Sequence, residues 1–136
     1  MRKWKTLLRG VIDSRLLLDT AVLIYAVERL SRRVEAALQD EAISLEFSAV
    51  SLTEIAIKDK VGKLTFPAEV VRRAVEALDI RIVPYTAEHA FRLFDLPLHH
   101  RDPFDRQIIA QALVEEIPVV TPDRKFMRYK GLNIVW

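Results

Sequence analysis

Residues 102–112 read Asp-Pro-Phe-Asp-Arg-Gln-Ile-Ile-Ala-Gln-Ala, and they contain two carboxylates three positions apart. Asp102 suits the N-cap of a helix, Pro103 its first residue, and Asp105 a first-turn position where the helix dipole favours negative charge. The apolar residues of this stretch that recur at helical spacing are Phe104, Ile108, Ile109 and Ala112. The stretch therefore predicts a helix that begins at Pro103, and this helix start accounts for both carboxylates.

Apolar strands alternate with helices along the rest of the chain. The predicted strands are 15–18, 43–47, 80–83, 117–121 and 133–135. The predicted helices are 21–27, an amphipathic helix that starts at Ser31, a helix that starts at Ser51, 68–78, a helix capped by Thr86, and a short helix that ends at Tyr129. This alternation predicts an α/β domain whose parallel sheet is covered by helices on both faces.

Two helices carry more detailed predictions. Ser51 and Glu54 match the capping box, in which the serine caps the helix and the glutamate reaches back to the cap. Phe91 and Phe94 fall on the apolar face of the helix after Thr86, so we expect both side chains in the core.

The composition fits one globular domain. The chain has 136 residues, of which 51% are hydrophobic and 29% charged, which is enough to bury a substantial core. It has no cysteine, which excludes a disulfide framework, a thiolate zinc site and a cysteine nucleophile, and suits the reducing cytoplasm. The longest apolar stretch, Ala21–Val27, is far shorter than a membrane span. We therefore expect a cytoplasmic protein that does not enter a membrane.

The net charge of +2 is unevenly distributed. Residues 1–15 hold five basic residues and one acidic residue, so the remainder holds 16 of the 21 basic and 18 of the 19 acidic residues. Nucleic acid would therefore have to be bound by local patches of basic residues and not by the electrostatic field of the protein's overall charge. Residues 1–14 have too little apolar length for a signal peptide. We interpret residues 1–14 as an N-terminal extension to which we assign no role, and residues 15–136 as the domain.

Four acids occupy equivalent places in the predicted fold. Asp19, Glu54 and Asp123 each follow a strand, and the carboxyl ends of parallel strands share one edge of the sheet. Asp105 joins them if its helix starts at that edge, which the loop at 96–101 permits. The four carboxylates are therefore predicted to form one cluster.

A cluster of carboxylates requires a compensating positive charge. Carboxylates within about 4–6 Å of one another raise each other's pKa. Oxygen ligands, without cysteine or histidine in these motifs, favour Mg²⁺ or Mn²⁺ over zinc. Such a cluster suits metal-assisted hydrolysis of phosphodiesters by one or two ions.

Most of these acids also have a local explanation. Taken alone, Glu54 is explained by the capping box, Asp102 by the N-cap and Asp123 by a turn after proline. Asp19 is harder to explain locally, because an acid that ends an apolar strand needs a partner or a cation. Together, the acids favour a site.

Basic and histidine residues near the acids have two interpretations. The bases that could rim the pocket and hold an RNA backbone are Arg101, Arg106, Lys125 and Arg128. Each of them alone is more simply explained as solvated surface. His99 and His100 could contact phosphate or shuttle protons, but exposed loop residues are the simpler interpretation.

Five motifs occur in order along the chain: LLLDT at 16–20, SAVSLTEIAIK at 48–58, GKL at 62–64, HRDPFDRQIIAQA at 100–112 and TPD at 121–123. Through these motifs residues 15–136 resemble PIN-domain proteins, specifically VapC-type toxins of bacterial and archaeal toxin–antitoxin pairs. The DPFDR block joined to the other motifs carries the resemblance.

The resemblance implies a three-layer α/β/α sandwich with a central parallel sheet of strand order 3-2-1-4-5, which puts Asp19 next to Asp123. It also implies an endoribonuclease that depends on Mg²⁺ or Mn²⁺ and forms a homodimer. A cognate VapB-like antitoxin would inhibit the enzyme by wrapping around it and plugging the acidic pocket.

Carried over by motif, the catalytic and metal-binding acids are Asp19, Glu54, Asp105 and Asp123. Asp19 and Asp105 would hold the metal, with the other two acids completing or positioning the water network. Asp102 is either a cap or an outer ligand. Thr20 and Thr121 would support the site through hydroxyl hydrogen bonds.

The chain departs from the family pattern at two positions. Related proteins often have an aromatic residue where Thr53 stands, and this difference alters the packing near Glu54. They often have a small residue where Pro122 stands, and the proline stiffens the turn that presents Asp123.

Two other functional classes stay open. The first is a catalytically weak PIN-like binding module that acts through its antitoxin or partner complex, and absence of metal uptake would favour it. The second is a receiver-like phosphotransfer domain that binds Mg²⁺. It would need a lysine opposite the phosphoacceptor, whereas the exit of the fourth strand offers Asp123.

Overall fold

The computed structural model describes residues 14–28 and 42–136 and contains a five-stranded, fully parallel sheet. Its strands are β1 (Ser14–Leu18), β2 (Ile43–Ser48), β3 (Arg81–Val83), β4 (Val119–Val120) and β5 (Ile134–Val135). The strand order β3-β2-β1-β4-β5 confirms the predicted order. β1 and β4, which are far apart in sequence, are therefore neighbours at the centre of the sheet.

The predicted helices that fall in the described residues are present. They are α2 (Thr20–Glu28), α4 (Ala49–Lys60), α5 (Ala68–Ala77), α6 (Ala87–Arg92), α7 (Pro103–Glu115) and the short 3₁₀ helices η1 (Leu93–Asp95) and η2 (Arg124–Arg128). The helix predicted to start at Ser31 lies outside the described residues. No helix in the described part of the chain has the length and apolar character needed to cross a bilayer.

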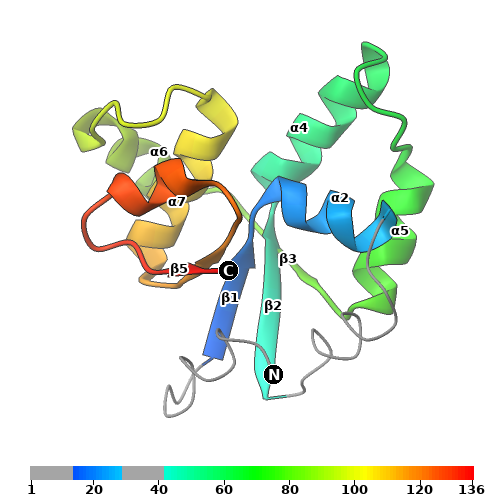
Figure 1. Cartoon of the computed structure of the whole chain (residues 1–136), viewed down its shortest axis with the longest axis horizontal. Helices are drawn as coiled ribbons and strands as arrows, with labels where there is room; N and C mark the ends of the chain where they lie inside the picture. Colours follow the sequence, from blue (N-terminus) through cyan, green and yellow to red (C-terminus); the bar gives the residue numbers. More distant parts are fainter. Residues whose placement is uncertain (1–13, 29–41) are drawn as a thin grey trace.

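Helices cover both faces of the sheet, as predicted, and Figure 1 shows α6 and α7 on one side with α2 and α5 on the other. Side chains alternate between the two faces along a strand. Leu16 and Leu18 of β1 pack in the cluster that includes α2 and α5, whereas Leu17 packs against Ile108 and Ile109 of α7. The central strand is therefore buried on both faces, which explains its continuous run of leucines.

The capping box predicted at Ser51 and Glu54 is wrong. Helix α4 begins directly after β2, and its N-cap is Ser48, whose hydroxyl accepts a hydrogen bond from the Val50 backbone N–H at 3.1 Å. Ser51 and Glu54 are buried residues inside the helix. The prediction failed because two serines three positions apart both suit a cap, and only the second has a glutamate three residues later.

The core positions predicted for Phe91 and Phe94 are also wrong. Their exposed fractions are 69% and 85%, and their rings lie side by side with centroids 6.1 Å apart. Helix α6 tightens into the 3₁₀ helix η1 after Arg92, so residues three apart eclipse each other and both rings point to solvent. His89 takes the buried position and completes a capping box with Thr86.

One ion pair joins the neighbouring strands β1 and β2. Glu46 of β2 is fully buried and accepts two hydrogen bonds from Arg15 of β1, at 2.6 Å from Nε and 2.7 Å from Nη2. Loss of one partner would leave a buried charge uncompensated. The free energy that this costs is larger than the free energy by which the intact ion pair stabilises the fold.

We predict that Arg15→Met lowers the free energy of unfolding by about 3 kcal/mol or more, measured by urea denaturation. The matched control is Arg73→Met, because Arg73 pairs with Glu69 at 3.4 Å on the solvent-exposed surface, and its loss is expected to change stability by well under about 1 kcal/mol. Equal effects of the two substitutions would contradict the role of the buried pair.

Candidate active site

The pairing of β1 with β4 places Asp19 against Thr121. The register aligns Leu18 with Val120, and the backbone N–H of Asp19 continues the ladder by donating to Val120 at 3.0 Å. The Thr121 hydroxyl donates to Asp19 Oδ2 at 2.8 Å, and both residues are buried. Because Leu18 and Val120 are paired, the polar residues that follow them, Asp19 and Thr121, lie next to each other.

Asp123 lies two residues beyond Thr121 and caps the short helix η2. Its backbone N–H donates to the Thr121 hydroxyl at 3.1 Å, and its Oδ1 accepts from the Lys125 backbone N–H at 2.9 Å. Thr121 therefore links Asp19 and Asp123 through one hydroxyl group. Thr20, the other predicted supporting threonine, donates its hydroxyl to Ser51 at 2.8 Å and so joins α2 to α4.

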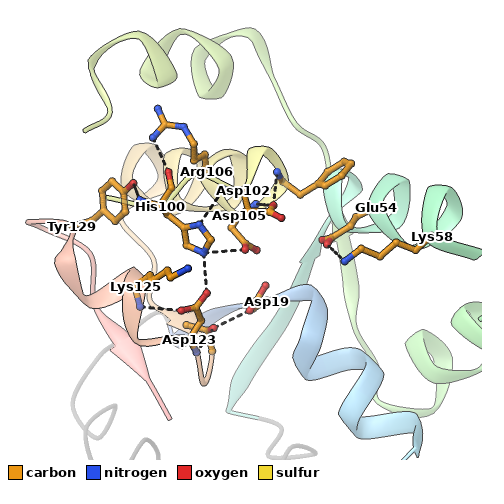
Figure 2. Close-up of polar contacts among 12 residues, drawn as sticks. Asp19, Glu54, Lys58, His100, Asp102, Asp105, Arg106, Asp123, Lys125 and Tyr129 are labelled. Carbon is orange, nitrogen blue, oxygen red and sulfur yellow. Dashed lines mark hydrogen bonds and ion pairs between the residues drawn. The ribbon is translucent and has the colours of Figure 1, made fainter. Parts of the chain in front are cut away.

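Asp105 reaches the same region from the first turn of α7. Asp102 is the N-cap of this helix, as predicted, and its Oδ1 accepts from the backbone N–H groups of Phe104 and Asp105 at 2.9 and 3.0 Å. The cap determines the direction of the first turn, and Figure 2 shows the Asp105 carboxylate directed toward Asp123 and His100.

Glu54 comes from the middle of α4, where its side chain is only 6% exposed. Its Oε2 lies 2.7 Å from the ammonium of Lys58, one turn further along the helix (Figure 2). Its Oε1 is buried without a hydrogen-bond partner among the described residues. Lys58 was not predicted as a site residue, although a glutamate followed four residues later by a lysine is the expected sequence signal of such an ion pair.

His100 is buried in the site, so the prediction that it is an exposed loop residue is wrong. It is 5% exposed, and its Nε2 lies 2.8 Å from Asp123 Oδ2 and 3.0 Å from Asp105 Oδ2. His99, the adjacent residue, is exposed as predicted. The only sequence signal that could distinguish the two histidines is the position of His100 two residues before the helix cap.

The electrostatics of the site differ from one acid to the next. Burial raises the pKa of Asp19 to about 6, against the opposing effect of its hydrogen bond from Thr121. Burial also raises the pKa of Asp105 to about 8, and the charges of Asp19, Asp102 and two further acids add to it. Asp19, which is buried, and Asp105, which is half-buried, therefore resist ionisation in the absence of a compensating cation.

The pKa values of Asp123 and Lys58 shift in the direction that favours the charged form of each side chain. Burial acts to raise the pKa of Asp123, but hydrogen bonds from the Lys125 backbone and from His100 outweigh it, and the pKa lies below its usual value. The hydrogen bond to Glu54 raises the pKa of Lys58.

The donor set fits a divalent cation. Side chains of Asp105, Asp123 and His100 offer ligand atoms that all lie within 4.8 Å of one another. The unpartnered Glu54 Oε1 and the raised pKa values of Asp19 and Asp105 are what a site built around a hard cation would show without it. Carboxylate oxygens in this number suit Mg²⁺ or Mn²⁺.

The basic residues predicted to form an RNA-binding rim differ in their surroundings. Arg101 and Lys125 are exposed beside the acids. Arg106 instead directs its guanidinium at the loop before α7, donating to the backbone carbonyls of Leu96, Pro97 and His100 at 3.1, 2.8 and 3.2 Å. In this structure Arg106 holds the loop that carries His100.

Comparison with known families gives a match over most of the chain. A family model described as the PIN domain matches residues 16–132. No curated protein matches the chain.

Several solved structures share the fold. VapBC-1 from nontypeable Haemophilus influenzae has a TM-score of 0.66 at 19% identity, over 88% of this chain and 96% of that chain. DNA-bound VapBC from Salmonella typhimurium has a TM-score of 0.65 at 16% identity, over 89% and 96%. A toxin–antitoxin complex from Klebsiella pneumoniae has a TM-score of 0.60 at 23% identity, also over 89% and 96%. At these identities the likeness shows a common fold.

The raised pKa of Asp105 generates a prediction for the metal-free protein. Between about pH 4 and pH 8 the folded protein binds a proton at Asp105 that the unfolded chain does not, so the free energy of unfolding falls as pH rises. We predict that the Tm in EDTA decreases from pH 6 to pH 8. Asp105→Asn should flatten this decrease and raise the Tm at pH 8 by about 5 °C or more.

The control for this experiment is Asp95→Asn, because Asp95 is an exposed acid in η1. It should leave the pH dependence of the wild type unchanged. A Tm that rises from pH 6 to pH 8 in the wild type would contradict the assignment.

Proposed function

The chain belongs to the PIN-domain family, and from this membership and its acidic site we propose that it is a VapC-like toxin, a metal-dependent endoribonuclease that hydrolyses RNA phosphodiester bonds. The observation that carries the proposal is the convergence of four acids from four elements beyond the carboxyl ends of the strands. In parallel α/β sheets this edge is where ligands bind. Nuclease activity explains why acids that destabilise one another through burial and repulsion are kept together.

Asp19 and Asp105 would hold the cation, with Asp123 and Glu54 completing the site or positioning water. A bound Mg²⁺ or Mn²⁺ supplies a Lewis acid that lowers the pKa of a water ligand and offsets negative charge on the phosphate. Asp102 serves as the helix cap, and a role as an outer ligand stays part of the proposal.

The chain's own residues contribute three actions. The lowered pKa of Asp123 keeps its carboxylate ionised near neutral pH, so it can accept a hydrogen bond from the attacking water. Thr121 holds Asp19 and the backbone of Asp123 at a constant separation. Arg101 and Lys125, exposed beside the acids, would bind RNA phosphates and draw the strand toward the pocket.

The proposed partner is a VapB-like antitoxin that blocks the acidic pocket. One solved structure that shares this fold is described as a toxin–antitoxin complex, and another as a member of the VapBC family of toxin–antitoxin systems. We further propose that the protein acts in the cytoplasm as a homodimer and that residues 15–136 form the catalytic domain, to which Ser14 also belongs as the first residue of β1.

We predict that Asp19→Asn lowers the rate of Mn²⁺-dependent RNA cleavage by at least about 100-fold, because it removes the charge of a buried metal ligand while keeping the shape of the side chain. The measurement is cleavage of a structured RNA with Mn²⁺ and, separately, with EDTA. Asp95→Asn serves as the control and should cleave at the wild-type rate. Undiminished cleavage by a clean preparation of Asp19→Asn would contradict the proposal and favour a binding module.

A further inference from the structure

His100 occupies the space between two of the proposed metal ligands. Its Nε2 is within hydrogen-bond distance of Asp105 Oδ2 and Asp123 Oδ2, and Figure 2 shows the ring edge directed at both carboxylates. One nitrogen thus joins an acid of α7 to an acid that follows β4. Two interpretations are open to such a histidine, which is either a third ligand of the cation or a hydrogen-bond donor to the ligands.

The other ring nitrogen distinguishes these interpretations. The backbone N–H of Asp102 points at His100 Nδ1, and the two nitrogens are 3.2 Å apart. A backbone N–H can donate a hydrogen bond but cannot accept one. A proton on Nδ1 would point at this hydrogen, so Nδ1 is the acceptor and the ring proton lies on Nε2. Nε2–H is then the group that faces the two carboxylates.

A protonated Nε2 has no lone pair for a metal. Ligation through this atom would require the proton to move to Nδ1, where it would oppose the Asp102 N–H. We therefore interpret the group formed by His100, Asp105 and Asp123 as two carboxylate ligands beside one N–H donor, which is hydrogen-bonded to Asp123 and in contact with Asp105. Nε2–H occupies one lone pair of Asp123 Oδ2 and leaves the others for a cation, and Asp105 Oδ2 lies in contact with Nε2 at 3.0 Å.

The imidazole is itself held firmly from several sides. The His100 backbone N–H donates to the Tyr129 hydroxyl at 2.8 Å, and that hydroxyl donates to the Pro97 carbonyl at 2.7 Å. Arg106 donates to the carbonyls of His100 and Pro97. The ring meets Phe126 edge to face with centroids 5.6 Å apart. A donor supported in this way can determine the positions of the ligands that it contacts.

We propose that His100 is a positioning residue that donates Nε2–H to Asp123 while its ring edge contacts Asp105, and that it thereby holds the two carboxylates at the separation a divalent cation needs. The proposal rests on the proposed function, because it assumes that these acids bind the metal. It explains why two acids from different segments of the chain, both of them partly exposed, have a common and defined orientation before any cation arrives.

The first test is the tautomer of His100 in the wild-type full-length chain, read from long-range ¹H–¹⁵N NMR of the imidazole at alkaline pH. The proposal requires Nε2–H without metal and after addition of Mg²⁺. A ring that carries its proton on Nδ1 in either state would overturn the proposal, because Nε2 would then be available as a ligand. This measurement needs no substitution, so it holds even if a His100 variant fails to fold.

The second test is Mn²⁺ affinity measured by electron paramagnetic resonance on His100→Phe. Phenylalanine keeps an aromatic ring against Phe126 and removes the donor, so we expect the Kd for Mn²⁺ to rise about 10- to 100-fold. The matched control is His99→Phe, one residue away and exposed, which keeps an aromatic ring beside Tyr129 and should change the Kd less than about twofold. Restored affinity in His100→Gln, which regains an N–H donor, would support positioning.

The outcomes separate this proposal from the proposed function. Wild-type RNA cleavage together with unchanged Mn²⁺ affinity in His100→Phe overturns the positioning role and leaves the nuclease assignment intact. Tight Mn²⁺ binding, an Nε2–H ring and weakened binding in His100→Phe, but no RNA cleavage by the wild type, support the positioning role and overturn the nuclease assignment.

Discussion

The parallel pairing of β1 with β4 is the constraint on which the site depends. It aligns Leu18 with Val120 and so sets Asp19 opposite Thr121, whose hydroxyl donates to Asp19 and accepts from the backbone of Asp123. The pairing of Leu18 with Val120 thereby brings Asp19 and Asp123, which are 104 positions apart in the chain, to the same edge of the sheet. Elements α4 and α7 then add Glu54 and Asp105 to this edge, each from a helix whose start is capped by a polar side chain.

Bringing four acids together is unfavourable unless their charge is offset, and the structure shows three partial compensations. Lys58 pairs with Glu54, the N-terminus of α7 lies beneath Asp105, and His100 contacts Asp105 and Asp123. Even so, the pKa values of Asp19 and Asp105 are raised, and one oxygen of Glu54 is buried without a described partner. A divalent cation would offset the negative charge that these contacts leave uncompensated.

Much of the fold, and the identity of the candidate acids, could be predicted from the sequence, because local patterns indicate the strands, the helix starts and the acids that follow them. The leucines before Asp19 indicate a buried strand, and the Asp102–Pro103 pair indicates a helix start, and both were confirmed. The strand order was not accessible from periodicity and came from the family resemblance. His100 could not be predicted because its burial depends on Arg106, Tyr129 and Asp123, which only the tertiary fold brings to it. The exposure of Phe94 depends on a change from α to 3₁₀ geometry that hydrophobic spacing does not reveal.

The central claim is that the four acids form one metal site, and the most direct measurement is an anomalous difference map from a crystal soaked in Mn²⁺. We predict a peak within coordination distance of carboxylate oxygens from both Asp19 and Asp105, with His100 Nε2 outside that distance. No peak among the acids after a soak at millimolar Mn²⁺, or a peak coordinated by His100 and separated from Asp19, would contradict it.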